Sequence, residues 1–137
     1  MLKKWVPWII AVVLFGTAGS LFFINRATED YILGKNIEEL AKSGLTEIAL
    51  SPLTDFDWDQ AMVYGPYTTE DQIENSLNIK FKGSTHGIEV LEDRFLLVFA
   101  KGNHAVKTTP LSRMVGDYSE KSISITPEND VLVVVKE

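Results

Sequence analysis

Carboxylates alternate with aromatic residues in the stretch Asp55–Asp59, which reads DFDWD. Clustered carboxylates are the ligands that calcium prefers, so the stretch is first a candidate for a calcium loop. An EF-hand loop beginning at Asp55 would need glycine where Gln60 stands and glutamate where Pro66 stands. The alternation instead favours an extended chain with its aromatic side chains facing inward and its carboxylates facing outward. We therefore expect no metal site here.

Two further arrangements could support chemistry: a pair of carboxylates acting as acid and base, and a metal site built on the histidines. Asp57 and Asp59 could lie within the separation of about 5–9 Å that glycoside hydrolysis requires, but many solvated carboxylate pairs do so as well. His86 and His104 are the only histidines, and a zinc site would need a third ligand that nothing in the sequence fixes. We expect both histidines at the surface, and no catalytic, cofactor-binding or metal-binding residue.

The usual nucleophile and phosphate motifs are also absent from the sequence. The chain has no cysteine, which excludes disulfides, thiolate metal sites and a cysteine nucleophile. It contains neither Gly-x-Ser-x-Gly nor Ser-x-x-Lys, and the loop Gly83–Gly87 lacks the lysine of a phosphate-binding loop. The sequence therefore predicts a protein that is not an enzyme and that carries no cofactor.

Aromatic residues are concentrated between Phe56 and Tyr67, and they are the main candidates for binding. Aromatic side chains anchor protein interfaces, but they also build the cores of small domains, so both interpretations are open. The residues predicted to bind a partner are Phe56, Asp57, Trp58, Asp59, Tyr64 and Tyr67.

The segment Ala27–Leu50 is expected to be a helix, because apolar residues recur in it at spacings near three and four. Thr28 is a plausible cap, and Gly44 favours an end near Ser43. The segment could be a stalk or the first packed helix. The residues of its predicted apolar face are Ile32, Ile37, Leu40, Ala41, Leu45 and Ile48.

The rest of the chain is expected to be a second helix and a meander of strands. Thr69 and Gln72 form a capping box for a helix that runs to about Leu77. Five or six strands, mostly consecutive late in the chain, imply an α+β domain with one antiparallel sheet. The predicted strands are Ala61–Tyr64, Ile88–Leu91, Phe95–Lys101, His104–Thr109, Ser119–Thr126 and Val131–Val135, with a short alternating segment at Ile79–Phe81 and a hairpin turn at Gly102-Asn103.

Twenty uncharged residues, Trp5–Ile24, are long enough to cross a bilayer as one transmembrane helix. Lys3 and Lys4 precede this run, which favours a cytoplasmic N-terminus and an extracytoplasmic remainder. A cleaved signal peptide is the alternative. The predicted divisions are a tip and anchor at 1–24, a stalk or first helix at 25–50, and an extracytoplasmic α+β domain at 51–137.

The part of the chain after the apolar run is acidic. All nineteen Asp and Glu residues lie there with eleven Lys and Arg residues, so its net charge is −8. An acidic surface repels nucleic acids and anionic lipid headgroups, and it attracts basic partners. We therefore expect no nucleic-acid binding and no flat contact of the domain with an anionic bilayer.

The stretch FDWD at Phe56–Asp59, followed by YGPYT at Tyr64–Thr68, resembles a pattern in small membrane-anchored or exported proteins of Gram-positive bacteria. The strand Phe95–Phe99 and the turn Gly102-Asn103 follow in the same order as in those families. The resemblance implies a small α+β fold and a location in the cell envelope. It implies no activity and no site residues.

Together these features predict a non-enzymatic, single-pass membrane protein at the cell membrane. Its acidic extracytoplasmic domain is expected to bind another envelope protein or a basic peptide, in an accessory or immunity-like role, while residues 5–24 contact the lipid bilayer. Two alternatives are a structural subunit of a membrane complex and a small envelope hydrolase that uses Asp57, Asp59 or the histidines.

Overall fold

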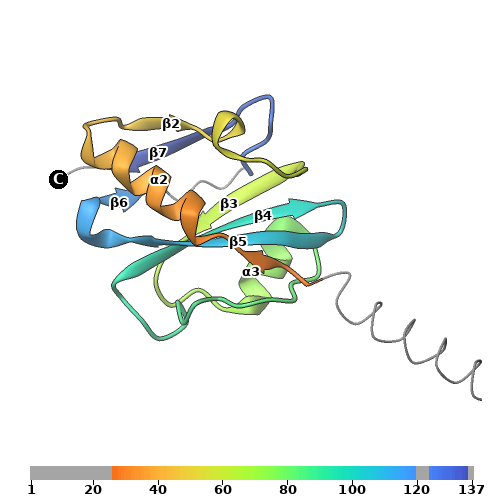
Figure 1. The fold of residues 1–137 in the computed structure, drawn as a ribbon. Helices are drawn as coiled ribbons and strands as arrows, with labels where there is room; N and C mark the ends of the chain where they lie inside the picture. The colour runs from red at the N-terminus through yellow and green to blue at the C-terminus, as the bar shows by residue number, and fades with distance from the viewer. Residues whose placement is uncertain (1–25, 120–123, 136–137) are drawn as a thin grey trace, which may run out of the picture.

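The computed structural model describes residues 26–119 and 124–135. Within these residues the fold is α+β, with two α-helices packed against two sheets (Figure 1). The helices are α2 (Tyr31–Lys42) and α3 (Glu70–Leu77). Two short 3₁₀ turns, η2 (Ser51–Leu53) and η3 (Arg113–Val115), complete the helical elements of this part of the chain.

The strands form two sheets where the sequence predicts one. The first sheet has the order β1-β5-β4-β3, and only its β1–β5 pair is parallel. The second has the order β2-β7-β6 and is antiparallel. The strands are β1 (Thr28–Glu29), β2 (Glu47–Ala49), β3 (Gln60–Tyr64), β4 (Arg94–Lys101), β5 (His104–Ser112), β6 (Asp117–Tyr118) and β7 (Val131–Val135).

The structure corrects the predicted fold class, which included a membrane-spanning helix. Among residues 26–119 and 124–135 no helix has both the length and the apolar composition that crossing a membrane requires. The longer of the two described α-helices, α2, has 12 residues. The segment Trp5–Ile24, on which that prediction was based, lies outside the described residues.

Strand β4 is the centre of the fold because both of its faces are buried. Phe95, Leu97 and Phe99 belong to a core that is shared with α2 and the three-stranded sheet. The alternate residues Leu96 and Val98 belong to a second core, formed with α3 and residues 79–88. Figure 1 shows α2, β2 and β7 on one side of the four-stranded sheet and α3 on the other. The apolar run at Phe95–Lys101 predicted such a central strand.

The first helix is shorter than the sequence predicts. Asp30, not Thr28, caps it, and Asp30 Oδ1 accepts a hydrogen bond from Leu33 N at 3.0 Å. Thr28 belongs to β1 and pairs with Lys107 in β5. The expected apolar face is correct at Ile37 and Ala41, which are buried. It is wrong at Ile32, which is 74% exposed, because Leu33 and Gly34 lie on the buried face in its place.

The second helix and the hairpin agree with their sequence predictions. Thr69 Oγ1 accepts from Gln72 N at 3.3 Å, and Gln72 Oε1 accepts from Thr69 N at 2.9 Å, which completes the capping box. Gly102, with a φ of +61°, turns β4 into β5. The predicted strand at Ile88–Leu91 is wrong, because this stretch forms turns, and the alternating segment at Ile79–Phe81 makes a single bridge.

One buried hydroxyl group lacks a partner among the described residues. Tyr118 is 3% exposed, its ring packs edge-on against Phe95 at 5.7 Å between centroids, and its Oη makes no hydrogen bond there. Burial, with a further contribution from Glu38, raises the pKa of Tyr118 to about 12. A hydroxyl that is removed from water without a hydrogen bond destabilises the fold.

We therefore expect Tyr118→Phe to raise the free energy of unfolding by about 1 kcal/mol, as measured by urea denaturation. Tyr64→Phe is the matched control, since Tyr64 is also buried but its Oη lies 2.5 Å from Ser76 Oγ. The control should lower the free energy of unfolding by about 1 kcal/mol. A loss of stability in Tyr118→Phe equal to that in the control would contradict the prediction.

Candidate partner-binding surface

The first two predicted binding residues, Phe56 and Trp58, lie against the core. Their rings contact Phe99 of β4 edge-on, at centroid distances of 5.1 and 5.2 Å. Trp58 is buried, and its Nε1 donates to Thr54 Oγ1 at 3.1 Å. The extended segment before β3 is therefore fixed to the sheet by its aromatic side chains, and the predicted inward orientation of the two rings is correct.

The two aspartates between and after these rings face outward, and one of them has a structural role. Asp59 Oδ2 accepts a hydrogen bond from Gly102 N at 2.8 Å, which ties the segment to the β4–β5 hairpin. Asp57 is exposed. Within the described ranges, no three His, Asp or Glu side chains are placed to hold a metal ion.

The two tyrosines of the predicted set lie in different environments. Tyr64 is buried in the second core beside α3, and burial raises its pKa to about 12. Tyr67 is 55% exposed, and its Oη donates to a carboxylate oxygen of Glu92. The predicted residues therefore do not form one surface, since Phe56, Trp58 and Tyr64 contribute to two separate cores.

Tyr67 has an unfavourable backbone conformation for an aromatic residue. Its φ is +69°, in the left-handed region, where a residue with a Cβ loses about 1–2 kcal/mol relative to its preferred conformation. The conformation is held by a hydrogen bond from Tyr67 N to Ile88 O at 2.5 Å. Backbone strain of this kind is concentrated at binding sites and other functional positions, which makes Tyr67 the strongest candidate of the predicted set.

Other large apolar side chains are exposed at the same end of the four-stranded sheet, where β4 begins and β5 ends. In Figure 1 this end lies on the left, whereas the described chain begins at residue 26 on the right. We call this set the distal surface. It consists of Tyr67, Val90, Leu91, Met114 and Val135. Met114 is 96% exposed and Val90 75%, so these side chains contribute little to the core.

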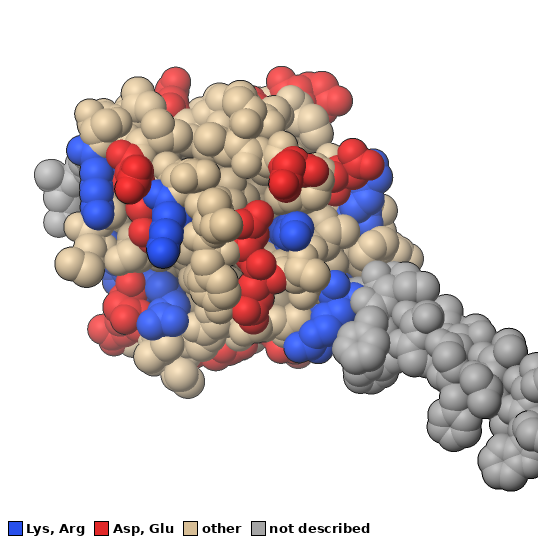
Figure 2. Space-filling model, in the orientation of Figure 1, with Lys and Arg blue, Asp and Glu red and all other residues tan. Residues whose placement is uncertain are grey.

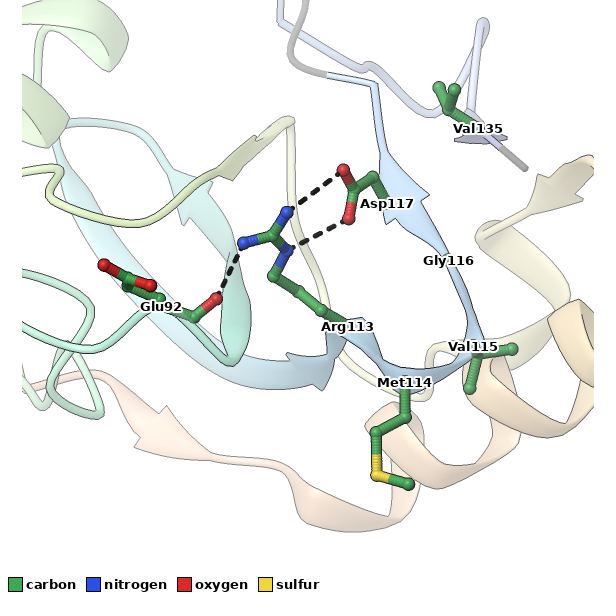
Figure 3. Close-up of a pocket in the computed structure, with 7 residues that line it drawn as sticks. All are labelled: Glu92, Arg113, Met114, Val115, Gly116, Asp117 and Val135. Carbon is green, nitrogen blue, oxygen red and sulfur yellow. Dashed lines mark hydrogen bonds and ion pairs between the residues drawn. The ribbon is translucent and has the colours of Figure 1, made fainter. Parts of the chain in front are cut away.

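A hollow of about 390 Å³ connects part of the distal surface with charged groups. Glu92, Arg113 and Asp117 line it together with Met114 and Val135 (Figure 3). Glu92 also accepts the hydrogen bond from Tyr67, so it links the tyrosine to the hollow.

The arginines at this end of the molecule are already paired. The Arg113 guanidinium donates to both carboxylate oxygens of Asp117, at 3.0 and 3.3 Å, and to Glu92 O at 2.8 Å. Arg94 binds Asp93 in the same bidentate way, at 2.7 and 3.2 Å. The carboxylates of Glu89 and Glu92 make no ion pair within the described residues, so the area around the distal surface has an excess of negative charge.

Sequence reasoning missed most of the distal surface. The sequence predicts a strand at Val90 and Leu91, and it predicts no helix or strand at Met114. The one available signal was the presence of large apolar side chains among turn residues, where polar side chains are usual. His86 lies only partly at the surface. It is half-buried, its Nε2 lies 3.3 Å from Thr108 Oγ1, and burial lowers its pKa.

The resemblance to Gram-positive envelope proteins stays a prediction, since nothing in the fold tests it. Function must therefore be inferred from the residues themselves, and the distal surface holds most of the large apolar side chains that are exposed in the described part of the chain. Comparisons of the chain with protein-family models, with curated proteins and with solved structures found no match.

Proposed function

We propose that the chain is a non-enzymatic partner-binding protein whose distal surface engages a basic, amphipathic segment of another protein or peptide. One observation carries the proposal: several large apolar side chains are exposed at one end of the fold, and two of them, Met114 and Val135, line a hollow. The nearby carboxylates of Glu89 and Glu92 make no ion pair within the described residues. Exposed apolar groups of this kind mark interaction sites, and methionine adapts well to the shape of a partner.

The charge of the molecule supports a basic partner. The chain after residue 24 has a net charge of −8, which increases the rate of encounter with cations and decreases it with anions. On the face shown in Figure 2, basic side chains lie next to acidic ones and form no wide basic area. Nucleic acid is therefore disfavoured as a partner.

The strained conformation of Tyr67 gives the sharpest test of the proposal. Tyr67→Gly is expected to weaken binding at least about tenfold, because it removes an exposed aromatic anchor. It should leave the free energy of unfolding unchanged or raised, because glycine adopts the observed φ of +69° without strain. Binding and stability would then change independently.

The probe is a synthetic helical peptide of alternating leucine and lysine pairs, and its control is the same peptide with glutamate in place of lysine. We expect fluorescence anisotropy to detect binding of the basic peptide alone, and this binding to weaken as salt is added. Ile32→Ala is the matched protein control, since Ile32 is 74% exposed on α2 and does not belong to the distal surface. Equal binding of both peptides, or full binding by Tyr67→Gly, would refute the proposal.

A location at the cell membrane is the second part of the proposal, and it rests on the sequence alone. The structural basis predicted for it lies in residues 5–24, outside the described residues. In fractionated cells that produce the full chain, we expect the protein in the membrane fraction. Recovery in the cytosol or in the medium would contradict this location and leave the peptide-binding proposal intact.

The hydrolase alternative is less favoured than partner binding. It would use Asp57 and Asp59 as an acid–base pair, but one carboxylate oxygen of Asp59 is already bound to Gly102 N. The subunit alternative has no specific support from the described residues.

A further inference from the structure

We propose that the Met114 thioether is an oxidation site, and that its conversion to the sulfoxide by a peroxide-class oxidant weakens binding at the distal surface. The first half of this proposal depends only on the structure around Met114. The second half rests on the proposed function.

The exposure of Met114 sets it apart from the other described methionine. Its side chain is 96% exposed, and Figure 3 shows it pointing away from the Arg113–Asp117 ion pair. Met62 is half-buried against the second core, where its Sδ lies 3.7 Å from Tyr64 Oη. An oxidant in solution therefore has free access to Met114 and restricted access to Met62.

The backbone around Met114 is fixed independently of its side chain. Ser112 Oγ accepts a hydrogen bond from Met114 N at 3.2 Å, and Arg113 N donates to Asp93 O at 3.1 Å. The turn closes with Gly116 N donating to Arg113 O at 3.2 Å. Because these bonds do not involve the thioether, an added oxygen atom should leave the turn and the core intact.

The reaction is a two-electron transfer with a simple balance. A lone pair on Met114 Sδ attacks one oxygen of hydrogen peroxide, an S–O bond forms and the O–O bond breaks. The hydroxide that leaves takes the proton released from the transferred hydroxyl group, so the products are the sulfoxide and water. Sulfur is oxidised and peroxide is reduced. With no cysteine in the chain, no thiol competes for the oxidant.

The product changes the chemistry of the distal surface. A sulfoxide is strongly polar, so it loses its hydrogen bonds with water when an apolar partner group covers it, and this desolvation weakens binding. We expect affinity for the basic amphipathic peptide to fall about tenfold on oxidation, comparable to the loss of one interface anchor.

The experiment treats the full chain with hydrogen peroxide and follows each methionine by peptide mass mapping, in buffer and in urea. We expect the Met114 rate in the native protein to lie within about twofold of its rate in urea. The Met62 rate should rise about tenfold or more on unfolding. Equal protection of both residues in the native protein would overturn the site assignment without affecting the proposed function.

Binding of the basic peptide is then measured before and after oxidation. Met114→Leu keeps an apolar side chain and should bind normally before and after peroxide treatment, whereas Met114→Gln should bind about tenfold more weakly throughout. Oxidation at Met114 with unchanged affinity would overturn the regulatory half of the proposal. Absence of binding before oxidation would overturn the proposed function and leave the oxidation site standing.

Discussion

Replacement of Phe99 by alanine is expected to lower the free energy of unfolding by about 3–5 kcal/mol. Phe99 is fully buried, and it is the residue against which the rings of Phe56 and Trp58 both pack. Its loss removes two edge-on aromatic contacts and leaves a cavity beneath the segment that leads into β3. Because small domains have a total stability of about 5–15 kcal/mol, the variant should be close to unfolding at 37 °C.

Urea denaturation followed by tryptophan fluorescence measures this effect directly, since Trp58 reports on the same contact. Val90→Ala is the matched control, because Val90 is largely exposed and its truncation should change stability by less than about 0.5 kcal/mol. If Phe99→Ala lowered the free energy of unfolding by less than about 1 kcal/mol, the contacts of Phe99 with Phe56 and Trp58 would contribute little to the stability of the fold.

The parts of the fold that could be predicted from the sequence are those fixed by local signals. The capping box of α3 joins residues three apart, and the turn at Gly102 joins adjacent strands. Strand β4 is apolar along its whole buried length, which is the pattern of a strand covered on both faces.

The second sheet could not be predicted in the same way, because its short strands depend on distant partners. β2 has three residues and pairs with β7 more than eighty residues later, and β6 has two. Strands this short carry no periodic pattern. The apolar spacing of α2 predicts its buried residue Ile37 correctly, but it also includes Leu45, which lies beyond the end of the helix at Lys42, and it omits Leu33, which is buried.

The candidate site was predicted only in part for a related reason. Aromatic residues in one stretch could be core or interface, and the choice depends on which sheet each side chain meets. Phe56 and Trp58 meet β4, whereas Tyr67 lies beyond the end of β3, where the chain turns in a left-handed conformation. Met114 lies in the short turn η3, and the placement of this turn after β5 brings its side chain to the distal surface.

Helix α2 packs so closely on β5 that a side chain at Gly34 should be strongly destabilising. A Cβ at Gly34 would lie 2.8 Å from Pro110 O, a backbone atom that cannot move without distorting β5, and 3.3 Å from Thr109 Cγ2. We expect Gly34→Leu to lower the free energy of unfolding by about 3 kcal/mol. Helix propensity acts in the opposite direction, since leucine favours a helix over glycine by roughly 0.5–1 kcal/mol, so the packing effect is the larger one.

Asn36→Leu on the exposed face of the same helix separates the two effects. It adds a large apolar side chain to α2 where nothing packs closely, so its stability should stay within about 0.5 kcal/mol of the parent protein. If Gly34→Leu behaved like Asn36→Leu in urea denaturation, α2 would have to sit farther from Pro110 than the structure places it. A selective loss at Gly34 would instead show that the glycine is required for contact between the helix and β5, which explains why a poor helix former lies in the middle of the buried face.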